Sequence, residues 1–329
     1  APNTSIHLIT DLEKDSGDEV NFDIYAQLTG SPTYGDDNLE GNEESLTPYS
    51  DKITINQVRK ATDSGGEMTR KRTTNNHRMI CRNKLTDWWS RFFDEAVFMN
   101  ISGARGSNAD YILPTSSTAA IEGQSLVARS SGNIIYSGAA TSKASLVSGD
   151  KFSLTSIDKA VTKAETEGGG SDGVIRITPL RMDGVDKFVC LMHNFQEHDL
   201  RVTTSTGQWL DIQKAVATNN GTKNPIFTGA LGEYRGVVLH KHNKVTRFSD
   251  YGAGSNVAAA RAIFMGRQAM VAAFGSPANG LRFDWAEEWR DYKNRLGIAT
   301  KCIVGLKRPQ FNGNDVNSIV IDSAAAQPY

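Results

Sequence analysis

Histidines and carboxylates in two short runs offer the residue types of a metal centre. His240 and His242 alternate in GVVLHKHNKV and point to the same face if that run is a strand. His193, Glu197 and His198 in MHNFQEHD supply imidazole and carboxylate donors that could complete a site for zinc or another divalent ion. No sequence feature brings the two runs together. A metal-dependent enzyme using His193, His198, His240 and His242 is therefore an alternative hypothesis, and satisfied or exposed histidines are the simpler interpretation.

Other catalytic patterns are absent from the sequence. It has no GxxxxGK[ST], HExxH or GxSxG motif and no strand-flanked GxGxxG. The glycine triplet at 168–170 follows a predicted helix, so it offers no helix N-terminus to an anion. Paired carboxylates such as Glu43 with Glu44 lie in polar segments, without the shared pocket that acid and base catalysis needs. We therefore expect no catalytic residue, no cofactor and no metal.

Charge is distributed in two opposed blocks. Residues 1–50 hold eleven acidic side chains and one base, a net charge of −10, whereas residues 51–91 hold ten bases and four acids, a net charge of +6. The blocks could pair with each other or with those of a neighbouring copy. The basic block contains five cationic residues in or beside one predicted helix: Arg70, Lys71, Arg72, Arg78 and Arg82. Because such a run can also hold phosphates, a monomeric module that binds a polyanion through this helix with Trp88 and Trp89 is a second alternative.

Size and composition set the broad class of the protein. A chain of 329 residues with 39% hydrophobic and 22% charged residues has one or two domains with a substantial core. No run of eighteen apolar residues exists, so we expect no membrane partner, and the first residues lack the pattern of a secretory signal. Cys81, Cys190 and Cys302 have no metal-binding spacing. They are expected to be reduced, buried thiols in a protein made in a cytoplasm.

The acidic block contains the pattern of a long hairpin. Apolar residues alternate from Val20 to Leu28, and Ile53 and Ile55 alternate again after a segment rich in glycine, proline and acidic residues. The segment between them has too few apolar residues to pack a core of its own. We predict an extended hairpin arm over residues 20–62, with a mobile surface loop as the alternative.

The basic block predicts a helix from Met68 to about Ile101. Its second half carries an apolar stripe at helical spacing: Leu85, Trp88, Trp89, Phe92, Phe93, Ala96 and Val97. A helix of that length spans roughly 45 Å. Its aromatic end is expected on a core, and its basic end projects or meets another subunit. The alternative is a buried helix broken near Thr73 to Asn76, where helix propensity is weak.

The rest of the chain predicts a mixed fold. Residues 102–152 are expected to form loops and short edge strands. A helix should start near Thr155 and Ser156, which are possible N-caps, and end before Gly168. Strands are predicted at 174–177 and 188–192, a buried helix at 257–273, and a long strand at 296–308 with a bulge at a glycine. The plan is α+β, without a regular βαβ order.

Five segments carry a resemblance to a known family. They are LEGNEESL at 39–46, LTDWW at 85–89, NFQEHDLR at 194–201, NPIFTGALGEYRGVVLHKHNKV at 224–245 and DYKNRLGIATKCIVGLKRPQF at 291–311. The order and residues of these segments resemble those of tailed-bacteriophage major capsid proteins common in short-tailed, N4-like phages, which have the HK97-like fold. The resemblance covers nearly the whole chain and is weakest at 102–150. Its most specific piece is IFTGALGEYRGVVLHKH.

The resemblance implies an architecture. It implies an N-terminal arm at 1–19, an extension loop at 20–66, a peripheral domain with a long spine helix at 67–150, an axial domain at 151–280, and C-terminal strands at 281–329 that return to the peripheral domain. The extension loop of one subunit would lie over the peripheral domain of its neighbour. The candidate inter-subunit contacts are then Asp36, Asp37, Glu40, Glu43 and Glu44 on the acidic side and Arg59, Lys60, Arg70, Lys71, Arg72, Arg78 and Arg82 on the basic side.

The resemblance also implies partners and a location. The chain would self-assemble as pentamers and hexamers into an icosahedral head that encloses double-stranded DNA, with non-specific contacts to that DNA. It lacks a coiled-coil heptad run, so a separate scaffolding protein is expected, with a segment removed from the chain as the alternative, together with a portal and a possible decoration protein. The protein would be a component of the virion, made and assembled in the bacterial host cytoplasm.

Overall fold

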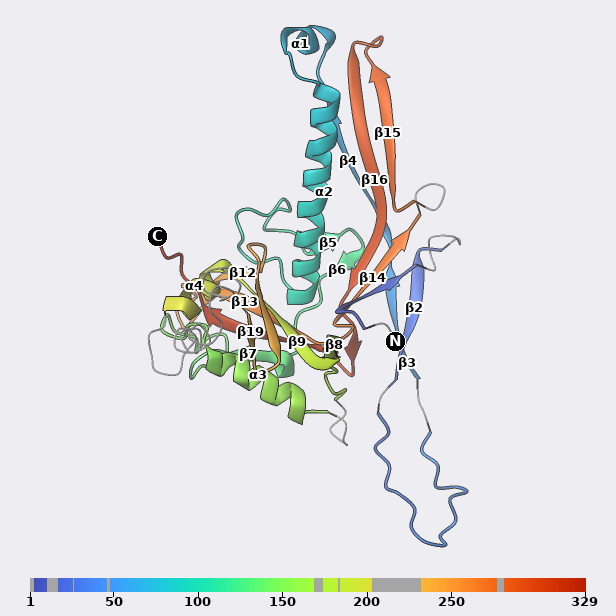
Figure 1. The fold of residues 1–329 in the computed structure, drawn as a ribbon, viewed down its shortest axis with the longest axis vertical. Coiled ribbons are helices and arrows are strands. Elements are labelled where there is room, and N and C mark those ends of the chain that lie inside the picture. The colour runs from blue at the N-terminus through green and yellow to red at the C-terminus, as the bar shows by residue number, and fades with distance from the viewer. Residues whose placement is uncertain are drawn as a thin grey trace.

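The chain forms an elongated lobe, a compact lobe and a hairpin that projects from the lower end of the elongated lobe (Figure 1). The structure is a computed structural model, and it describes residues 3–10, 17–25, 27–45, 48–168, 174–182, 184–202, 232–276 and 281–329. Among these residues, no helix is long and apolar enough to cross a membrane. The mixture of helices and two main sheets confirms the predicted α+β class.

The elongated lobe is a five-stranded sheet covered on one face by a long helix. Its strands are β1 (Ile6–Ile9), β4 (Asn56–Asp63), β14 (Met270–Gly275), β15 (Phe283–Arg290) and β16 (Arg295–Lys307). β14 and β15 pair in succession along one edge of β16, and β4 pairs along the other edge. The predicted strand at 296–308 is confirmed. The predicted bulge is wrong, because the pairings of β16 run through both of its glycines, Gly297 and Gly305, without a register shift.

The helix of this lobe is divided where the sequence is polar. α1 (Glu67–Arg72) ends at Thr73, and α2 (His77–Ser102) begins after Asn76, whose side chain accepts a hydrogen bond from Met79 N at 3.2 Å. The predicted single helix is therefore wrong at this point, and the alternative break is confirmed. The burial proposed with that break is wrong, because residues 71–76 are exposed. The aromatic half of α2 packs on the sheet, as expected, around Trp89, Phe92 and Val304.

The compact lobe is an eight-stranded sheet with two helices. Its strands are β7 (Ile134–Tyr136), β8 (Leu180–Met182), β9 (Val185–Met192), β10 (Glu233–Tyr234), β11 (Val237–Lys241), β12 (Arg247–Tyr251), β13 (Val257–Met265) and β19 (Ser318–Ala324). α3 (Leu154–Thr166) buries Ile157 and Val161 against this sheet, and α4 (Asn194–Val202) contacts β13. The predicted strand at 188–192 is confirmed, and so is the predicted helix that ends before Gly168.

Short elements complete the fold. They are the hairpin of β2 (Glu19–Tyr25) and β3 (Pro48–Thr54), the hairpin of β5 (Ala119–Ile121) and β6 (Gln124–Ser125), the pair β17 (Gln310–Phe311) and β18 (Asn314–Asp315), and the 3-10 turn η2 (Ser131–Asn133). The β2–β3 pairing confirms the root of the predicted hairpin. The arm is shorter than the predicted 20–62, because β4 leaves the hairpin and joins β16.

The predicted buried helix at 257–273 is wrong, because this segment forms two strands. Its small residues, such as Ala259 and Ala262, are buried on both faces of a sheet, and that pattern is also typical of a buried helix. The chain turns at Gly266, where an added Cβ would lie 2.3 Å from Thr178 O. Since β13 belongs to the eight-stranded sheet and β14 to the five-stranded one, the chain passes here from one lobe to the other.

Two smaller predictions are also corrected. Residues 174–177 pair with no strand in the described chain, and Ile177 is apolar because it is buried in the core of the compact lobe. α3 begins one residue before Thr155, and Ser156 is buried and hydrogen-bonded to Ser137 instead of capping the helix. The C-terminal strands divide between the lobes: β15 and β16 lie in the elongated lobe, whereas β19 lies in the compact one.

Candidate inter-subunit surfaces

The acidic loop, residues 27–45, lies at one end of the long axis of the molecule (Figure 1). Asp36, Asp37 and Glu40 are exposed, and within the described chain their side chains have no hydrogen-bond or ion-pair partner. The carboxylate of Glu44 instead accepts hydrogen bonds from the backbone N–H groups of Thr29 and Gly30 at 2.6–3.0 Å, which hold its pKa below the ordinary value. Glu44 therefore ties the two sides of the loop together, whereas the other three acids remain open to a partner.

The basic surface, formed by α1 and the first turns of α2, lies at the opposite end of the long axis (Figure 1). Lys71 and Arg72 are exposed and have no side-chain partner among the described residues. The guanidinium of Arg70 lies 5.2 Å from the ring centre of Trp289. Because the acidic loop and this surface lie at opposite ends, they do not pair within one chain.

Two of the predicted basic contacts have a partner in their own chain. Arg78 and Arg82 lie 2.8 and 3.4 Å from the carboxylate of Glu287 on β15. The hydrogen bond from Arg78 lowers the pKa of Glu287. Arg82 also stacks on Trp285, with 4.6 Å between the guanidinium and the ring centre. These two arginines fasten α2 to β15.

The remaining predicted contacts lie on β4 and in the acidic loop. The Lys60 ammonium lies 5.4 Å from the ring centre of Trp88, whereas Arg59 is exposed. Glu43 accepts a hydrogen bond from Gly41 N at 2.7 Å. The charges that remain open within the described chain are therefore fewer than those predicted: Asp36, Asp37 and Glu40 in the acidic loop, Lys71 and Arg72 on the basic surface, and Arg59 on β4.

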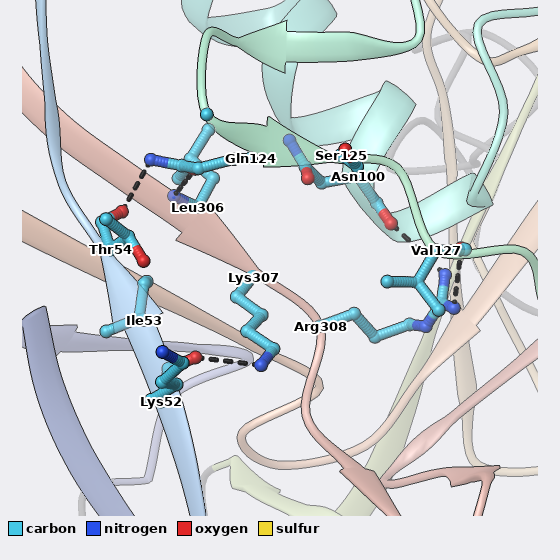
Figure 2. Close-up of a pocket in the computed structure, with 11 residues that line it drawn as sticks. Lys52, Ile53, Thr54, Asn100, Gln124, Ser125, Val127, Leu306, Lys307 and Arg308 are labelled. Atoms are coloured by element: carbon cyan, nitrogen blue, oxygen red, sulfur yellow. Dashed lines mark hydrogen bonds between the residues drawn. The ribbon is translucent and has the colours of Figure 1, made fainter.

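The root of the hairpin is fastened to the body around a cavity of about 190 Å³ (Figure 2). Gln124 spans two strands: its side-chain amide donates to Thr54 O at 2.5 Å and accepts from Leu306 N at 2.9 Å. Lys307 Nζ lies 2.5 Å from Asp51 and 2.8 Å from Lys52 O. These contacts fix where the hairpin leaves the body. Sequence reasoning missed Gln124, which lies in a stretch without an apolar pattern.

Two glycines allow the hairpin root to pack closely against the five-stranded sheet. An added Cβ at Gly305 would lie 2.4 Å from Thr54 O, and one at Gly275 would lie 2.9 Å from the side chain of Ile55. Ile53 and Ile55 are buried there against Ile9 and Val271. The hairpin therefore has a packed root, whereas its distal loop lies in solvent.

A group of buried arginines holds the C-terminal end of α2. Arg261 donates to Ser102 O at 2.8 Å, Arg129 to Ile101 O at 3.2 Å, and Arg308 to Asn100 O at 3.2 Å. These carbonyls are the unpaired acceptors at the negative end of the helix dipole.

The charges of these arginines are compensated by two buried carboxylates. Asp322 lies 2.7 Å from Arg261, and Asp315 lies 2.6 Å from Arg308 and 3.0 Å from Arg129. Burial, together with the charge of Arg308, lowers the pKa of Arg129 to about 9.

The histidines do not form a metal centre in the described chain. His193 is buried and accepts from Phe195 N at 3.1 Å, while burial and then Arg247 lower its pKa to about 4. His242 stacks on Phe98, and His198 and His240 are exposed. Among the described residues, no three metal-ligating side chains come together. The geometry therefore gives no support to the metal-dependent alternative.

Known proteins that are similar to this chain are capsid proteins. A family model described as phage capsid protein matches residues 1–327. The major capsid protein of Pseudomonas phage KPP25 is 27% identical, and the match covers 94% of this chain and 82% of that protein. The capsid of Ralstonia phage GP4 is 45% identical with a TM-score of 0.88, covering 100% of this chain and 89% of that one.

A more distant solved structure has the same fold. The capsid protein of Cyanophage Pam1 is 19% identical, with a TM-score of 0.75 over 99% of this chain and 90% of that one. The segment predicted to be most specific, IFTGALGEYRGVVLHKH, begins outside the described residues and ends on β10 and β11.

Proposed function

Because the chain belongs to the phage capsid protein family and is a major capsid protein with the HK97-like fold, we propose that the acidic loop of each copy lies against the basic surface of a neighbour. The observation that supports this most directly is the position of the two charged surfaces at opposite ends of one chain (Figure 1). A head-to-tail contact of this kind repeats from copy to copy and closes into rings when the rotation between copies allows it.

The resulting assembly would be an icosahedral head built from pentamers and hexamers. Such a shell encloses double-stranded DNA, and contacts to it would involve phosphates without sequence preference. The shell would form in the host cytoplasm with a separate scaffolding protein and a portal, and it could take a decoration protein. A subunit with this role performs no turnover, which agrees with the lack of a catalytic motif in the sequence.

Charge reversal in the acidic loop tests this contact. The variant should change Asp36, Asp37 and Glu40 to Lys and leave Glu44 intact, because Glu44 holds the loop itself together. Exposed ion pairs contribute up to about 1 kcal/mol each, so the reversal should cost about 2 kcal/mol per subunit, roughly a 30-fold rise in the concentration needed for assembly. Particles are counted in electron micrographs, and the circular dichroism of the unassembled subunit should not change.

The same chain supplies a control and a rescue. Changing Glu122, Glu165 and Asp186 to Lys alters the net charge equally on other exposed segments and should leave assembly intact. Adding Arg59→Glu, Lys71→Glu and Arg72→Glu to the loop variant should recover part of the particle yield. Normal assembly of the loop variant would show that the contact is not made.

A further inference from the structure

Opposite charges alone stabilise a contact between subunits only weakly. Exposed ion pairs are screened by salt and add little affinity, whereas a few well-packed side chains, with tryptophan and tyrosine prominent among them, dominate the energetics of protein interfaces. If the proposed contact holds a shell together, each of its two surfaces must also present apolar anchors. The structure contains such residues on both.

The basic surface carries an exposed apolar group, here called the aromatic tip: Met68, Trp289 and Tyr292. Tyr292 is fully exposed, Met68 is 58% exposed and Trp289 is 52% exposed. Trp289 lies under Arg70 of α1. Met68 belongs to α1 itself, so the apolar group and the exposed charges of Lys71 and Arg72 are parts of one surface.

The backbone of the tip holds Tyr292 in an unusual position. Asp291, Tyr292 and Lys293 have φ angles of 52°, 52° and 73°, a left-handed conformation that favours glycine. The turn is fixed to α1, because Asn294 Oδ1 accepts from Glu67 N at 2.9 Å and Asn294 N donates to Asp291 O at 2.9 Å. Three strained residues in a row present an aromatic side chain wholly to solvent, and strain of this kind is concentrated at functional positions.

The acidic loop carries a matching apolar group. Leu28, Tyr34 and Leu39 are 64%, 73% and 63% exposed. Tyr34 begins a turn closed by the hydrogen bond from Asp37 N, and Leu39 begins another closed by Asn42 N. Each turn therefore presents an apolar side chain beside the open carboxylates of the loop.

We propose that the aromatic tip is the docking site for the acidic loop of a second copy, in which Tyr34 and Leu39 cover Trp289 and Tyr292. This inference rests on the proposed function and names the residues that hold the same contact. The open acids and bases surround these apolar groups and set the approach and register of the two copies, since charge complementarity acts mainly on orientation and association rate. The fixed turn lowers the ordering entropy lost on docking, because Tyr292 is already in place.

Photo-crosslinking of particles assembled from the full chain together with its scaffolding protein tests the contact. A benzophenone amino acid replaces Tyr292 in one variant, Lys71 in a second and Tyr329 in a third, and crosslinked peptides are identified by mass spectrometry. Tyr329 is a matched control, because it is 91% exposed and lies on the compact lobe. Position 292 should crosslink to residues 28–44 of another copy, whereas position 329 should not.

The outcomes separate this inference from the proposed function. Crosslinks to the loop from position 71 but not from position 292 would leave the charge contact standing and overturn the aromatic docking site. Crosslinks to the loop from neither position would overturn both. Crosslinks from position 292 only to a different polypeptide, seen when virions are used, would assign the tip to another partner and overturn docking of a second copy.

A double-mutant cycle measures the coupling. Tyr34→Ala and Tyr292→Ala should each raise the subunit concentration required for assembly by about tenfold, as expected for interface anchors. The double variant should be little worse than either single variant, because both remove the same contact. Tyr329→Ala should leave assembly unchanged. Independent, multiplying effects of the two changes, or no effect of either, would overturn the pairing.

Discussion

The two ends of α2 use arginine in opposite ways. At the C-terminal end, Arg129, Arg261 and Arg308 are buried, bind helix carbonyls and are compensated by Asp315 and Asp322. At the N-terminal end, the bases are exposed, and their partners are either surface groups such as Glu287 or absent from the described chain. The difference indicates a division of roles, in which buried charges fix the fold of one subunit and exposed charges are available to a neighbour.

Asp322→Ala should have the largest effect on the buried end. It leaves Arg261 without its carboxylate inside the protein, and breaking a buried ion pair on one side costs about 3–5 kcal/mol. Urea denaturation of the unassembled subunit measures this loss. Asp250→Ala, which breaks the exposed pair with Lys143, is the matched control and should change stability by less than about 1 kcal/mol. Equal effects of the two variants would remove the distinction between buried and exposed charges.

Acidification should destabilise the compact lobe through His193. Its folded-state pKa of about 4 lies below the ordinary 6.5, so between these values the unfolded chain binds more protons. Stability is therefore lost as the pH falls from 6.5 to 4, by at most about 3 kcal/mol. In His193→Gln the difference in unfolding free energy between pH 7 and pH 4 should shrink. An unchanged difference would show that His193 is not the group responsible.

Glu287→Gln should have the smallest effect on the free subunit. It removes the carboxylate shared by Arg78 and Arg82 at the exposed end, and surface pairs contribute about 0–1 kcal/mol. Thermal unfolding of the unassembled subunit should therefore shift only slightly, and the shift should vanish in high salt. A loss as large as that of Asp322→Ala would mean that the two ends of α2 do not differ as described.

Local sequence patterns predicted the elements in which buried apolar residues recur at a regular spacing. The hairpin root, α3 and β16 carry a periodic apolar pattern, and the structure confirms them. β13 and β14 were missed because small residues buried on both faces of a sheet fit a helix equally well. The environment of these two strands is set by distant parts of the chain, which a local pattern does not contain.

The candidate surfaces were only partly predictable for the same reason. Charge blocks located the acidic loop and the basic surface, but the pairing of Arg78 with Glu287 joins residues 209 positions apart. Arg129 and Ser318, which are 189 positions apart, likewise have no local signature. The exposure of Tyr292 depends on a turn in which three successive non-glycine residues are left-handed, and sequence periodicity does not indicate that conformation.

A reconstruction of the assembled shell at side-chain resolution tests the central claim most directly. The account predicts that residues 27–45 of one subunit lie over α1 and the β15–β16 turn of a neighbour, with Asp36, Asp37 and Glu40 within ion-pair distance of Lys71, Arg72 or Arg59. A shell in which the loop contacts its own subunit, or a surface of the neighbour far from α1, would contradict it.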